Sequence, residues 1–298
     1  IRAQLPDDTK RFELVDTEFK ELMREIQGDP RVVQACCAEG REATLANMMK
    51  ELEKCEKALN EYLEVKKSIF PRFYFVSNAA LLDILSNGNN PPKIMPHIGS
   101  VFDGIGLLEL CHTPDQERDM QDDPDMKPPP MEASKAMISK DRETVKFSSI
   151  FEMIGAVENW LNELVTHMQT TLSFVLTDSM ADAANWETEK PREEWVFLYP
   201  AQICLVTSQI IWTDETERAL EELESGTEDA MKKYQEVCTN RLEALIKLVQ
   251  GELSRSDRNK IITVITIDVH NRDVVAALVT KRIDSTGDFK WQSQLRYY

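Results

Sequence analysis

The sequence is poor in the residue types and spacings from which catalytic centres are built. Its four histidines, at positions 97, 112, 167 and 270, are scattered, and none has a histidine or cysteine partner at zinc-ligand spacing. The sequence contains neither the G-x-x-x-x-G-K-[ST] loop that cradles nucleotide phosphates nor the G-x-S-x-G turn of serine nucleophiles. Gly104-Ile105-Gly106 lacks the third glycine of a dinucleotide-binding loop. We therefore expect no catalytic, cofactor-binding or metal-binding residue in this chain.

Cysteine pairs, long apolar runs and positive charge are also scarce. The six cysteines show no C-x-x-C spacing, so we expect reduced, buried thiols rather than disulfides. No apolar run approaches the roughly 18 residues that a membrane span needs, so no membrane partner is expected. With 35 basic and 52 acidic residues, the formal net charge is −17. Such a chain repels polyanions, which argues against direct contact with nucleic acid or with an acidic polymer.

What the chain does have is helical periodicity, and its 42% apolar residues suffice for one elongated domain or two compact ones. Apolar residues recur every three or four positions from Thr9 to Gln27, which predicts an amphipathic helix ended by Gly28-Asp29-Pro30. A second helix is predicted from about Arg41 to Lys67. Its seam consists of Leu45, Met48, Leu52, Cys55, Leu59 and Tyr62. This seam favours antiparallel packing within the chain, and an intermolecular coiled coil is the alternative.

The helical pattern is then interrupted. Pro71 must end the preceding helix, because it lacks an N–H group and restricts the residues before it. Phe73-Tyr74-Phe75-Val76 has the aromatic and β-branched composition of a strand. Asn78 is expected to cap a short helix behind it. A turn-rich stretch follows at 86–92 and includes Gly88.

Three further segments complete this irregular region. A short helix is predicted at about 93–102. The acidic, proline-rich segment Pro114–Pro130 is expected to be a mobile or disordered loop on the surface. The segments 136–139 and 143–147 flank Lys140-Asp141-Arg142, a pattern that predicts a small β-hairpin.

The remaining chain is predicted to be helical, from Val157 through Leu172, at about 200–225 and at about 228–250. The Ile- and Val-rich segment Lys260–Lys281 has strand propensity, but the spacing of its later apolar residues favours a helix. The aromatic residues expected in the core are Phe73, Phe75, Trp160 and Trp212. The expected fold is mainly α, an elongated rod of consecutive helical bundles with one or two short β-strands or hairpins.

Five regions are expected along the chain. They are an N-terminal helical bundle at 1–68, a strand with short helices that forms a joint at 69–110, the acidic loop at 111–135, a central and C-terminal helical bundle at 136–283, and a connection into a further domain at 284–298. The chain opens at Ile1 without an initiator methionine, so we expect a fragment of a longer protein.

Two stretches of the sequence resemble one protein family. Pro71-Arg72-Phe73-Tyr74-Phe75, continuing through Ser77-Asn78 to Ile84-Leu85, resembles the PRFYF-(S/G)N-(D/E)LL-IL segment in the linker of dynein heavy chains. The end of the chain, from Asp288-Phe289 through Trp291 to Gln294-Leu295-Arg296-Tyr297-Tyr298, resembles the DFxWxxQLRYYW stretch where that linker meets the first AAA+ module.

Further landmarks lie between these two stretches. They are Val157-Glu158-Asn159-Trp160-Leu161, Tyr199-Pro200-Ala201-Gln202-Ile203 and Ile211-Trp212-Thr213. In order and rough spacing the resemblance covers about the last four-fifths of the chain. The sequence at 56–63 and 83–88 is most similar to that of axonemal, outer-arm-type chains. Related chains commonly have a Gly-containing turn in the hairpin, which this sequence replaces with Lys140-Asp141-Arg142.

The resemblance implies a mechanical role. In this family the linker is an α-helical rod that arches over a ring of AAA+ modules, bends when ATP binds the first module, and straightens to deliver the power stroke along microtubules. It implies that ATP and Mg²⁺ are held in the ring of the parent heavy chain and not in this segment. The expected location is the cytoskeleton of the cytoplasm, in the axoneme of a cilium or flagellum.

The same resemblance implies partners and candidate residues. The expected partners are the AAA+ ring of the same heavy chain, and intermediate, light and neighbouring heavy chains of a dynein arm, without direct microtubule contact by this segment. Pro71, Asn78 and Gly88 mark the candidate hinge region. Trp291, Tyr297 and Tyr298 mark the candidate ring junction and are expected to be partly exposed. The alternative is a static helical scaffold that docks neighbouring subunits through the acidic loop and its exposed helix faces.

Overall fold

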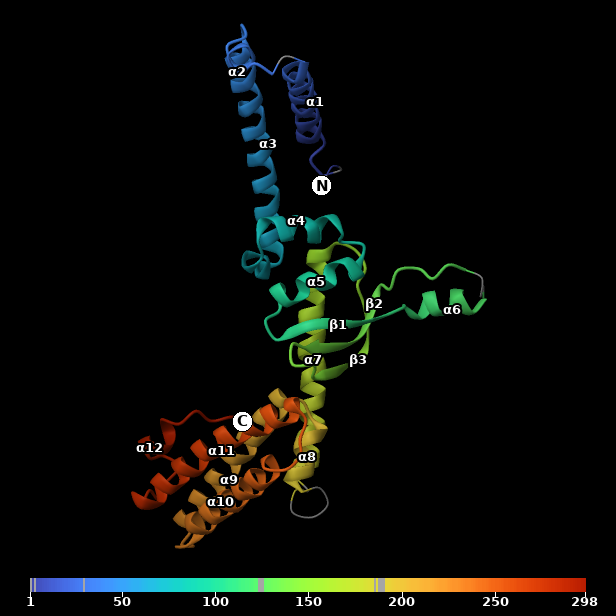
Figure 1. Cartoon of the computed structure of the whole chain (residues 1–298). Coiled ribbons are helices and arrows are strands. Elements are labelled where there is room, and N and C mark those ends of the chain that lie inside the picture. Colours follow the sequence, from blue (N-terminus) through green and yellow to red (C-terminus); the bar gives the residue numbers. More distant parts are fainter. Residues whose placement is uncertain (1, 3, 29, 123–125, 185, 187–190) are drawn as a thin grey trace. The chain divides into compact units, whose positions relative to one another are not determined.

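A computed structural model describes residues 2, 4–28, 30–122, 126–184, 186 and 191–298. Most of these residues are helical, and a small sheet has the strand order β1-β2-β3 (Figure 1). The predicted class, mainly α with a few strands, is confirmed. The chain divides into two compact units, which are described separately below. The first comprises Ile1–Ser134 and Glu152–Leu164, and the second comprises Lys135–Phe151 and Val165–Tyr298.

The first unit opens with two long helices, α1 (Pro6–Gly28) and α3 (Arg41–Ile69), which lie side by side in opposite directions (Figure 1). The short helix α2 (Val32–Cys36) connects them. Arg11 Nε lies 3.0 Å from Glu51 Oε2 across this hairpin. The seam of α3 therefore packs within the chain, as predicted. The packing is one-sided, since Met48 is buried but Leu45 and Leu52 remain 42% and 40% exposed.

The aromatic run after α3 is not a strand, and this prediction is wrong. Pro71–Phe75 forms a 3₁₀ helix, η1, in which Phe73 N donates to Phe70 O at 3.0 Å. A strand would place Phe73 and Phe75 on one face, whereas a period of three places Phe70, Phe73 and Val76 together. These three side chains are buried, and Phe75 is 82% exposed. The predicted core role therefore fails for Phe75, while it is confirmed for Phe73, Trp160 and Trp212.

Three short elements follow η1. The helix α4 (Asn78–Ser86) is capped by Ser77, whose Oγ accepts from Ala80 N at 3.3 Å, so the predicted cap at Asn78 is one residue too late. The helix α5 (Pro91–Val101) begins with two prolines. Proline suits the first turn of a helix, because the N–H group that it lacks would have no partner within the helix there. Strand β1 (Ile105–Cys111) comes next and was not predicted.

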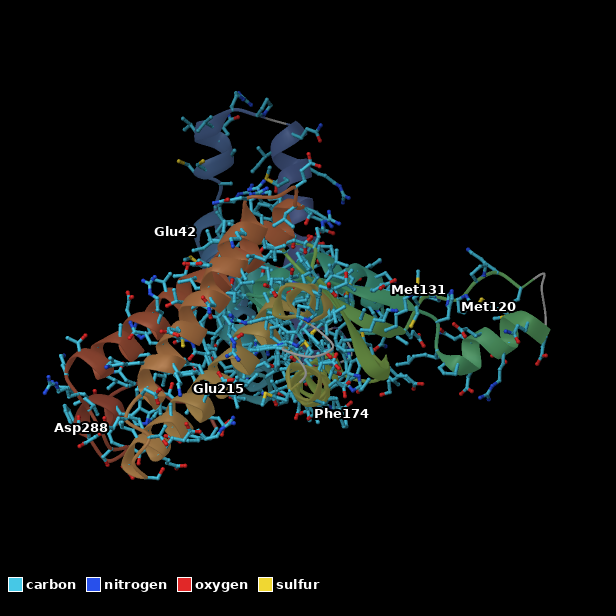
Figure 2. The ribbon with its side chains drawn as sticks, turned by 90° about the horizontal axis from the view of Figure 1, so that it is seen from below. Glu42, Met120, Met131, Phe174, Glu215 and Asp288 are labelled. Carbon is cyan, nitrogen blue, oxygen red and sulfur yellow. The ribbon has the colours of Figure 1, made fainter. Side chains whose placement is uncertain are left out.

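The acidic segment is partly ordered, contrary to the prediction of a loop. Pro114–Asp122 forms helix α6. Thr113 Oγ1 accepts from Gln116 N at 3.2 Å, and Gln116 Oε1 accepts from Thr113 N at 3.0 Å, which is a reciprocal capping box. Figure 2 labels Met120 on this helix and Met131 just after the acidic segment. The prediction for residues 123–125 lies outside the described residues.

The predicted hairpin is confirmed as β2 (Ala133–Ser139) and β3 (Thr144–Glu152). Its turn contains no glycine. Arg142 takes the positive φ of 71° instead, and its N–H donates to Ser139 O at 3.1 Å. A non-glycine residue in this left-handed region is strained, so the neighbouring contacts of the turn must hold it.

The second unit contains the long helices. Helix α7 (Val157–Ala183) leads into it, and α8 (Arg192–Leu198), α9 (Ala201–Glu224), α10 (Ala230–Val249) and α11 (Arg255–Thr280) follow. Helices α9, α10 and α11 pack against one another (Figure 1). The Ile- and Val-rich segment is helical as predicted. Its buried positions recur every three or four residues: Ile261, Val264, Asp268, Asn271, Val275 and Leu278. Tertiary packing therefore outweighs strand propensity there.

A buried ion pair ties three of these helices together. Arg192 Nη1 and Nη2 donate to the two carboxylate oxygens of Asp268 at 2.5 and 2.9 Å. Nη2 also donates to Ser208 Oγ at 3.1 Å, so α8, α9 and α11 meet at one guanidinium. The guanidinium lies 5.1 Å from the centre of the Trp186 ring. This fork-to-fork geometry fixes the alignment of the helices as well as their separation.

The hairpin is held to the same bundle through one carboxylate. Glu143, in the β2–β3 turn, accepts from Ala201 N at 3.0 Å at the start of α9. Its Oε1 also lies 3.0 Å from Lys260 Nζ, and that ammonium donates to Tyr199 O at 2.9 Å. A carboxylate at a helix N-terminus meets unpaired N–H groups and a favourable dipole. This contact stabilises the strained turn that Arg142 forms.

The cysteines of the described structure form no disulfide. The prediction of buried thiols holds only in part, because Cys36 and Cys37 are exposed and Cys204 is buried. Burial raises the pKa of Cys204 to about 12, and burial also raises that of Cys238 to about 11. These two thiols therefore remain protonated at neutral pH and act as packing groups rather than nucleophiles.

Asp268→Ala is expected to destabilise the second unit by about 3–5 kcal/mol, because it leaves the buried Arg192 guanidinium without its partner. Urea unfolding followed by tryptophan fluorescence measures this loss. The matched control is Asp273→Ala on the same helix, which removes an exposed pair with Arg272 and should cost no more than about 0.5 kcal/mol. Equal losses in the two variants would show that the buried pair has no special role.

Candidate functional site

The joint that the sequence predicts at residues 69–110 is built around an aromatic cluster. Phe70 and Phe73 are fully buried and contact edge to face, with ring centres 5.0 Å apart. The Phe102 ring lies 6.4 Å from that of Phe70. The Arg72 guanidinium covers Phe102 at 4.9 Å from its centre. The cluster joins η1 to the end of α5, which makes this stretch a packed knot rather than a loose connection.

Polar contacts fix the end of α3 beside this knot. Lys66 Nζ forms an ion pair with Glu158, whose side chain is 5% exposed, at the start of α7. One turn further along α7, Asn162 Nδ2 donates to Ile69 O, the last residue of α3, at 2.9 Å. Both contacts lie within the first unit. They hold the last turn of α3 against the first turns of α7.

A second polar group lies on the outer side of the joint. Lys67 Nζ donates to Glu64 Oε1 at 3.0 Å and to Asn78 Oδ1 at 3.2 Å. Tyr74 OH donates to the other oxygen of Glu64 at 3.1 Å. The hydrogen bond from Lys67 and then that from Tyr74 lower the pKa of the Glu64 carboxyl. Asn78 therefore serves as a side-chain acceptor for α3 instead of as a helix cap.

The three candidate hinge residues lie at the edges of this knot. Pro71 is the first residue of η1, and Asn78 is the first residue of α4. Gly88 follows α4, and a Cβ added there would lie 3.6 Å from the Val157 side chain. The structure therefore brings them to the borders of one packed region and not to a common cavity. Their role as a hinge remains a prediction.

The candidate ring junction is organised by Trp291. Its side chain is fully buried, which corrects the expectation of partial exposure. The indole contacts that of Trp212 edge to face, with ring centres 5.3 Å apart. Helix α12 (Phe289–Gln292) presents it, and Asp288 caps that helix by accepting from Lys290 N at 2.7 Å. Figure 2 labels Asp288 beside this helix.

The path of the chain into α12 is set by the end of α11. Arg282 adopts a positive φ of 51°, Ile283 N donates to Leu278 O at 3.0 Å, and Arg282 N donates to Val279 O at 3.1 Å. This is the Schellman pattern of hydrogen bonds that ends a helix. Ile283 and Leu278 are both buried in the core that contains Trp291. The turn thereby directs the C-terminal segment, residues 284–298, back over the bundle.

Beyond α12 the segment lies along α9. Tyr297 N donates to Thr213 Oγ1 at 3.1 Å. Tyr297 and Tyr298 are 37% and 79% exposed, as expected for these two residues. A groove of about 240 Å³ separates the segment from the bundle. Its lining residues from the segment are Gln294, Leu295 and Tyr297, and α9 and α11 supply mainly Leu205, Val206, Trp212 and Ile267.

Sequence reasoning missed one residue of this region. Glu217 on α9 accepts from Trp291 Nε1 at 3.1 Å and from Tyr298 OH at 2.8 Å. It belongs to an acidic run with Glu215, labelled in Figure 2, and such a run is typical of a solvated helix face. Nothing in the sequence separates Glu217 from its acidic neighbours, because its partners lie more than seventy positions away.

The described part of the chain offers little metal or membrane chemistry. No group of three or more His, Cys, Asp or Glu side chains in it is placed to hold a metal ion. None of the helices in the same part is both long and apolar enough to cross a membrane.

Comparison with known proteins identifies the family. The family model described as dynein heavy chain, N-terminal region 2, matches residues 1–179, which is more than half of the chain. The chain belongs to the dynein heavy chain family. The family that the sequence resembles is thereby confirmed.

Individual dynein heavy chains match over the whole of this segment. It is 43% identical to the ciliary dynein beta chain of Tripneustes gratilla, 42% to human dynein axonemal heavy chain 9, and 41% to the flagellar outer arm dynein beta chain of Chlamydomonas reinhardtii. Each match covers 100% of this chain and 6% of the relative. The similarity to axonemal, outer-arm-type chains predicted from the sequence is also confirmed.

Phe73→Ala and Phe75→Ala are expected to differ sharply, although the residues are two positions apart. Removing the buried Phe73 ring from the joint should lower the unfolding free energy by about 3–5 kcal/mol. Removing the exposed Phe75 ring should change it by no more than about 0.5 kcal/mol. Urea unfolding followed by circular dichroism measures both variants. Losses of similar size in the two variants would indicate the strand pattern instead of the 3₁₀ helix, because a strand places both rings on one face.

Proposed function

We propose that this chain is a linker segment of an axonemal dynein heavy chain and acts as a mechanical lever. It would couple the nucleotide state of the AAA+ ring to movement along microtubules in a cilium or flagellum. The observation that carries the proposal is the burial of Trp291. The C-terminal segment, which resembles the junction with the first AAA+ module, is anchored in the core of the bundle. A force applied at that junction would therefore reach α9 and α11 without a slack connection.

The second unit has the stiffness that a lever needs. Its core around Trp212 and Trp291 includes residues of α9, α10 and α11, and a second core surrounds Trp195. Bending any one of these helices away would open a packed core, which costs several kcal/mol for each large side chain exposed. The fork between Arg192 and Asp268 adds a directional constraint that apolar packing lacks.

A lever also needs a compliant point, and the joint supplies candidates for it. Hinges lie in a few residues at loops or element ends that absorb changes in φ and ψ. We place the hinge at the borders of the aromatic knot, in the region marked by Pro71, Asn78 and Gly88. The ion pair between Lys66 and Glu158 would then hold one of the two bent states.

The chemistry that drives the lever would lie elsewhere in the heavy chain. We propose that the AAA+ ring of the same chain binds ATP and Mg²⁺ and is the direct partner of the C-terminal segment. The parent heavy chain would be the ATPase, with this segment contributing no nucleotide site. Its net charge of −17 disfavours contact with an acidic polymer, so the microtubule would be touched by another part of the motor.

The lever proposal predicts a change in distance that depends on nucleotide. In a heavy chain extended through the AAA+ ring, one dye is attached on α3 at Asn60 and a second on α10 at Glu236. A third position at Glu163, in the part of α7 that belongs to the first unit, gives a control pair with Asn60 across the joint. We expect energy transfer between α3 and α10 to differ between the nucleotide-free, ATP-bound and ADP-bound states.

The control pair locates the movement. If transfer between Asn60 and Glu163 also changes, the hinge lies at the joint; if it stays constant, the hinge lies after Leu164. Constant transfer for both pairs in all three states would refute a lever that bends within this segment. The exposed Cys36 and Cys37 and the half-buried Cys55, Cys111 and Cys238 are replaced by serine beforehand, to limit labelling at other positions of this segment.

A static docking scaffold is the second candidate, and one observation favours it. Exposed apolar side chains are frequent on the hairpin of α1 and α3, among them Phe12, Phe19, Met23, Leu45, Met49 and Leu52. Their spacings of three, four and seven residues place them in a stripe along one side of each helix. The occupant under this hypothesis is a neighbouring subunit of the dynein arm.

Replacing Pro114–Pro130 by a short Gly-Ser linker separates the two functions. A lever should still drive microtubule gliding at close to its normal speed, because α6 takes no part in the anchors of the C-terminal segment. A scaffold that docks through the acidic loop should lose incorporation into the axonemal arm. Incorporation and gliding are measured on the same preparations. Loss of gliding speed with normal incorporation would contradict both expectations for this segment.

A further inference from the structure

Three donors of the C-terminal segment converge on one carboxylate oxygen. Trp291 Nε1, Arg296 Nη1 and Tyr298 OH lie 3.1, 3.4 and 2.8 Å from Glu217 Oε1. Trp291 lies in α12, Arg296 and Tyr298 lie beyond it, and Glu217 lies in the C-terminal half of α9. A glutamate on a solvated helix face would bind water and would not accept from three side chains that are distant in sequence. The arrangement has the form of an anchor.

The environment of Glu217 strengthens these contacts. Its side chain is 25% exposed, and that of Arg296 is 20% exposed, so water screens the pair less than it screens a surface pair. The Arg296 guanidinium lies 6.0 Å from the Trp291 ring centre and 5.7 Å from the Tyr298 ring centre. The cation is thus enclosed by two aromatic rings and one carboxylate. Hydrogen bonds to an ionised acceptor are about twice as strong as neutral ones.

Burial of Trp291 alone does not explain how the last residues are held. That indole anchors α12, but Leu295 and Tyr298 beyond it are 74% and 79% exposed. The backbone contact with α9 that the structure describes in this stretch is the bond from Tyr297 N to Thr213 Oγ1. Beneath it lies the open groove rather than a packed core. The direction of the final residues therefore depends on polar contacts.

We propose that Glu217 is the positioning residue of the C-terminal segment, and that its carboxylate sets the direction in which the chain leaves the bundle. Trp291 attaches the segment to the core, and Glu217 sets the direction of its last residues by holding Arg296 and Tyr298 against α9. The consequence for movement rests on the lever function proposed above. The positioning itself does not, and it can be tested on the 298-residue chain alone.

Amide hydrogen exchange tests the positioning directly. In Glu217→Ala, we expect the Tyr297 amide to exchange about tenfold faster or more, because charged hydrogen bonds hold it near Thr213. Glu217→Gln keeps a neutral acceptor and should give an intermediate rate. The matched control is Glu221→Ala, one turn further along α9, where the side chain is exposed. Exchange at Tyr297 should not change in that control, nor should exchange in α10 change in any variant.

The Tyr298 phenol gives a second readout, which reports on its contact with Glu217, while unchanged exchange in α10 excludes a general loss of structure. Partial desolvation of the phenol group, followed by its hydrogen bond to the Glu217 carboxylate, raises the pKa of Tyr298. Removing the carboxylate in Glu217→Gln should lower this pKa toward its ordinary value, since ionisation no longer places two negative charges side by side. Carbon-13 labelling of the tyrosine rings, with Tyr298→Phe to assign the signal, follows the titration.

The outcomes are distinct. Faster exchange at Tyr297 in Glu217→Ala, with a lower Tyr298 pKa in Glu217→Gln, supports the positioning role. Unchanged exchange in Glu217→Ala overturns it and assigns the whole attachment to Trp291. In a heavy chain with its ring, Glu217→Ala should then slow microtubule gliding while ATP turnover continues. Normal gliding with a loosened segment would refute the mechanical consequence, whereas the dye pairs on α3 and α10 test the lever independently.

Discussion

The buried pair of Arg192 and Asp268 is the constraint on which the second unit depends. A guanidinium that donates to both oxygens of one carboxylate admits a single alignment of the helices that carry them. Apolar side chains of similar size would bind the helices at least as strongly but would tolerate sliding. The pair therefore contributes register more than net stability. Ser208 extends the same register to α9, which is the helix that receives the C-terminal segment.

From this pair a succession of contacts along α9 and beside it leads toward the end of the chain. Trp186 lies against the guanidinium and contacts the ring of Trp195, with centres 4.9 Å apart. One turn of α9 beyond Ser208 is Trp212, which contacts Trp291. The polar anchor at Glu217 follows a little further along the same helix. Rigid packing and directional polar contacts thus alternate along α9, so that movement of the last residues relative to α11 would require several of them to break.

The sequence predicted the long helices well, because their apolar residues recur over many turns. The prediction failed where the composition of a few residues favoured one periodicity and their burial follows another. In Phe70–Val76 the composition favours a strand, but Pro71 supplies a helical φ angle, and the buried residues follow a period of three. Thr113 and Gln116 carry a recognisable capping box, and the acidic, proline-rich composition around them obscured it. Local signals were present in both places, and bulk composition outweighed them.

The candidate site could be predicted only in part, for a different reason. Trp291, Tyr297 and Tyr298 stand in a motif, and so the region was found. The burial of Trp291 was not predicted. It depends on contact with Trp212, which lies 79 positions earlier in the chain, and periodicity shows only that Trp212 is a core residue. Glu217 and Arg192 are long-range partners of the same kind. Charge pairs between distant segments leave no periodic trace in a sequence, which is why acidic positions along α9 look equivalent until the fold distinguishes them.

The packing of the joint restricts how a bend can occur there. Separating Phe70 and Phe73 from Phe102 would expose large aromatic surfaces at about 3–5 kcal/mol for each ring. The end of α3, η1 and the end of α5 should therefore move as one body. Bending is therefore expected at the borders of that body, where the contacts are polar or few. One border is the ion pair of Lys66 with Glu158, and the other is the turn in which Gly88 lies near Val157. An ion pair breaks and re-forms with less loss than an aromatic core, because water can solvate both charges in the open state. A lever built on this chain would bend around the knot and not through it.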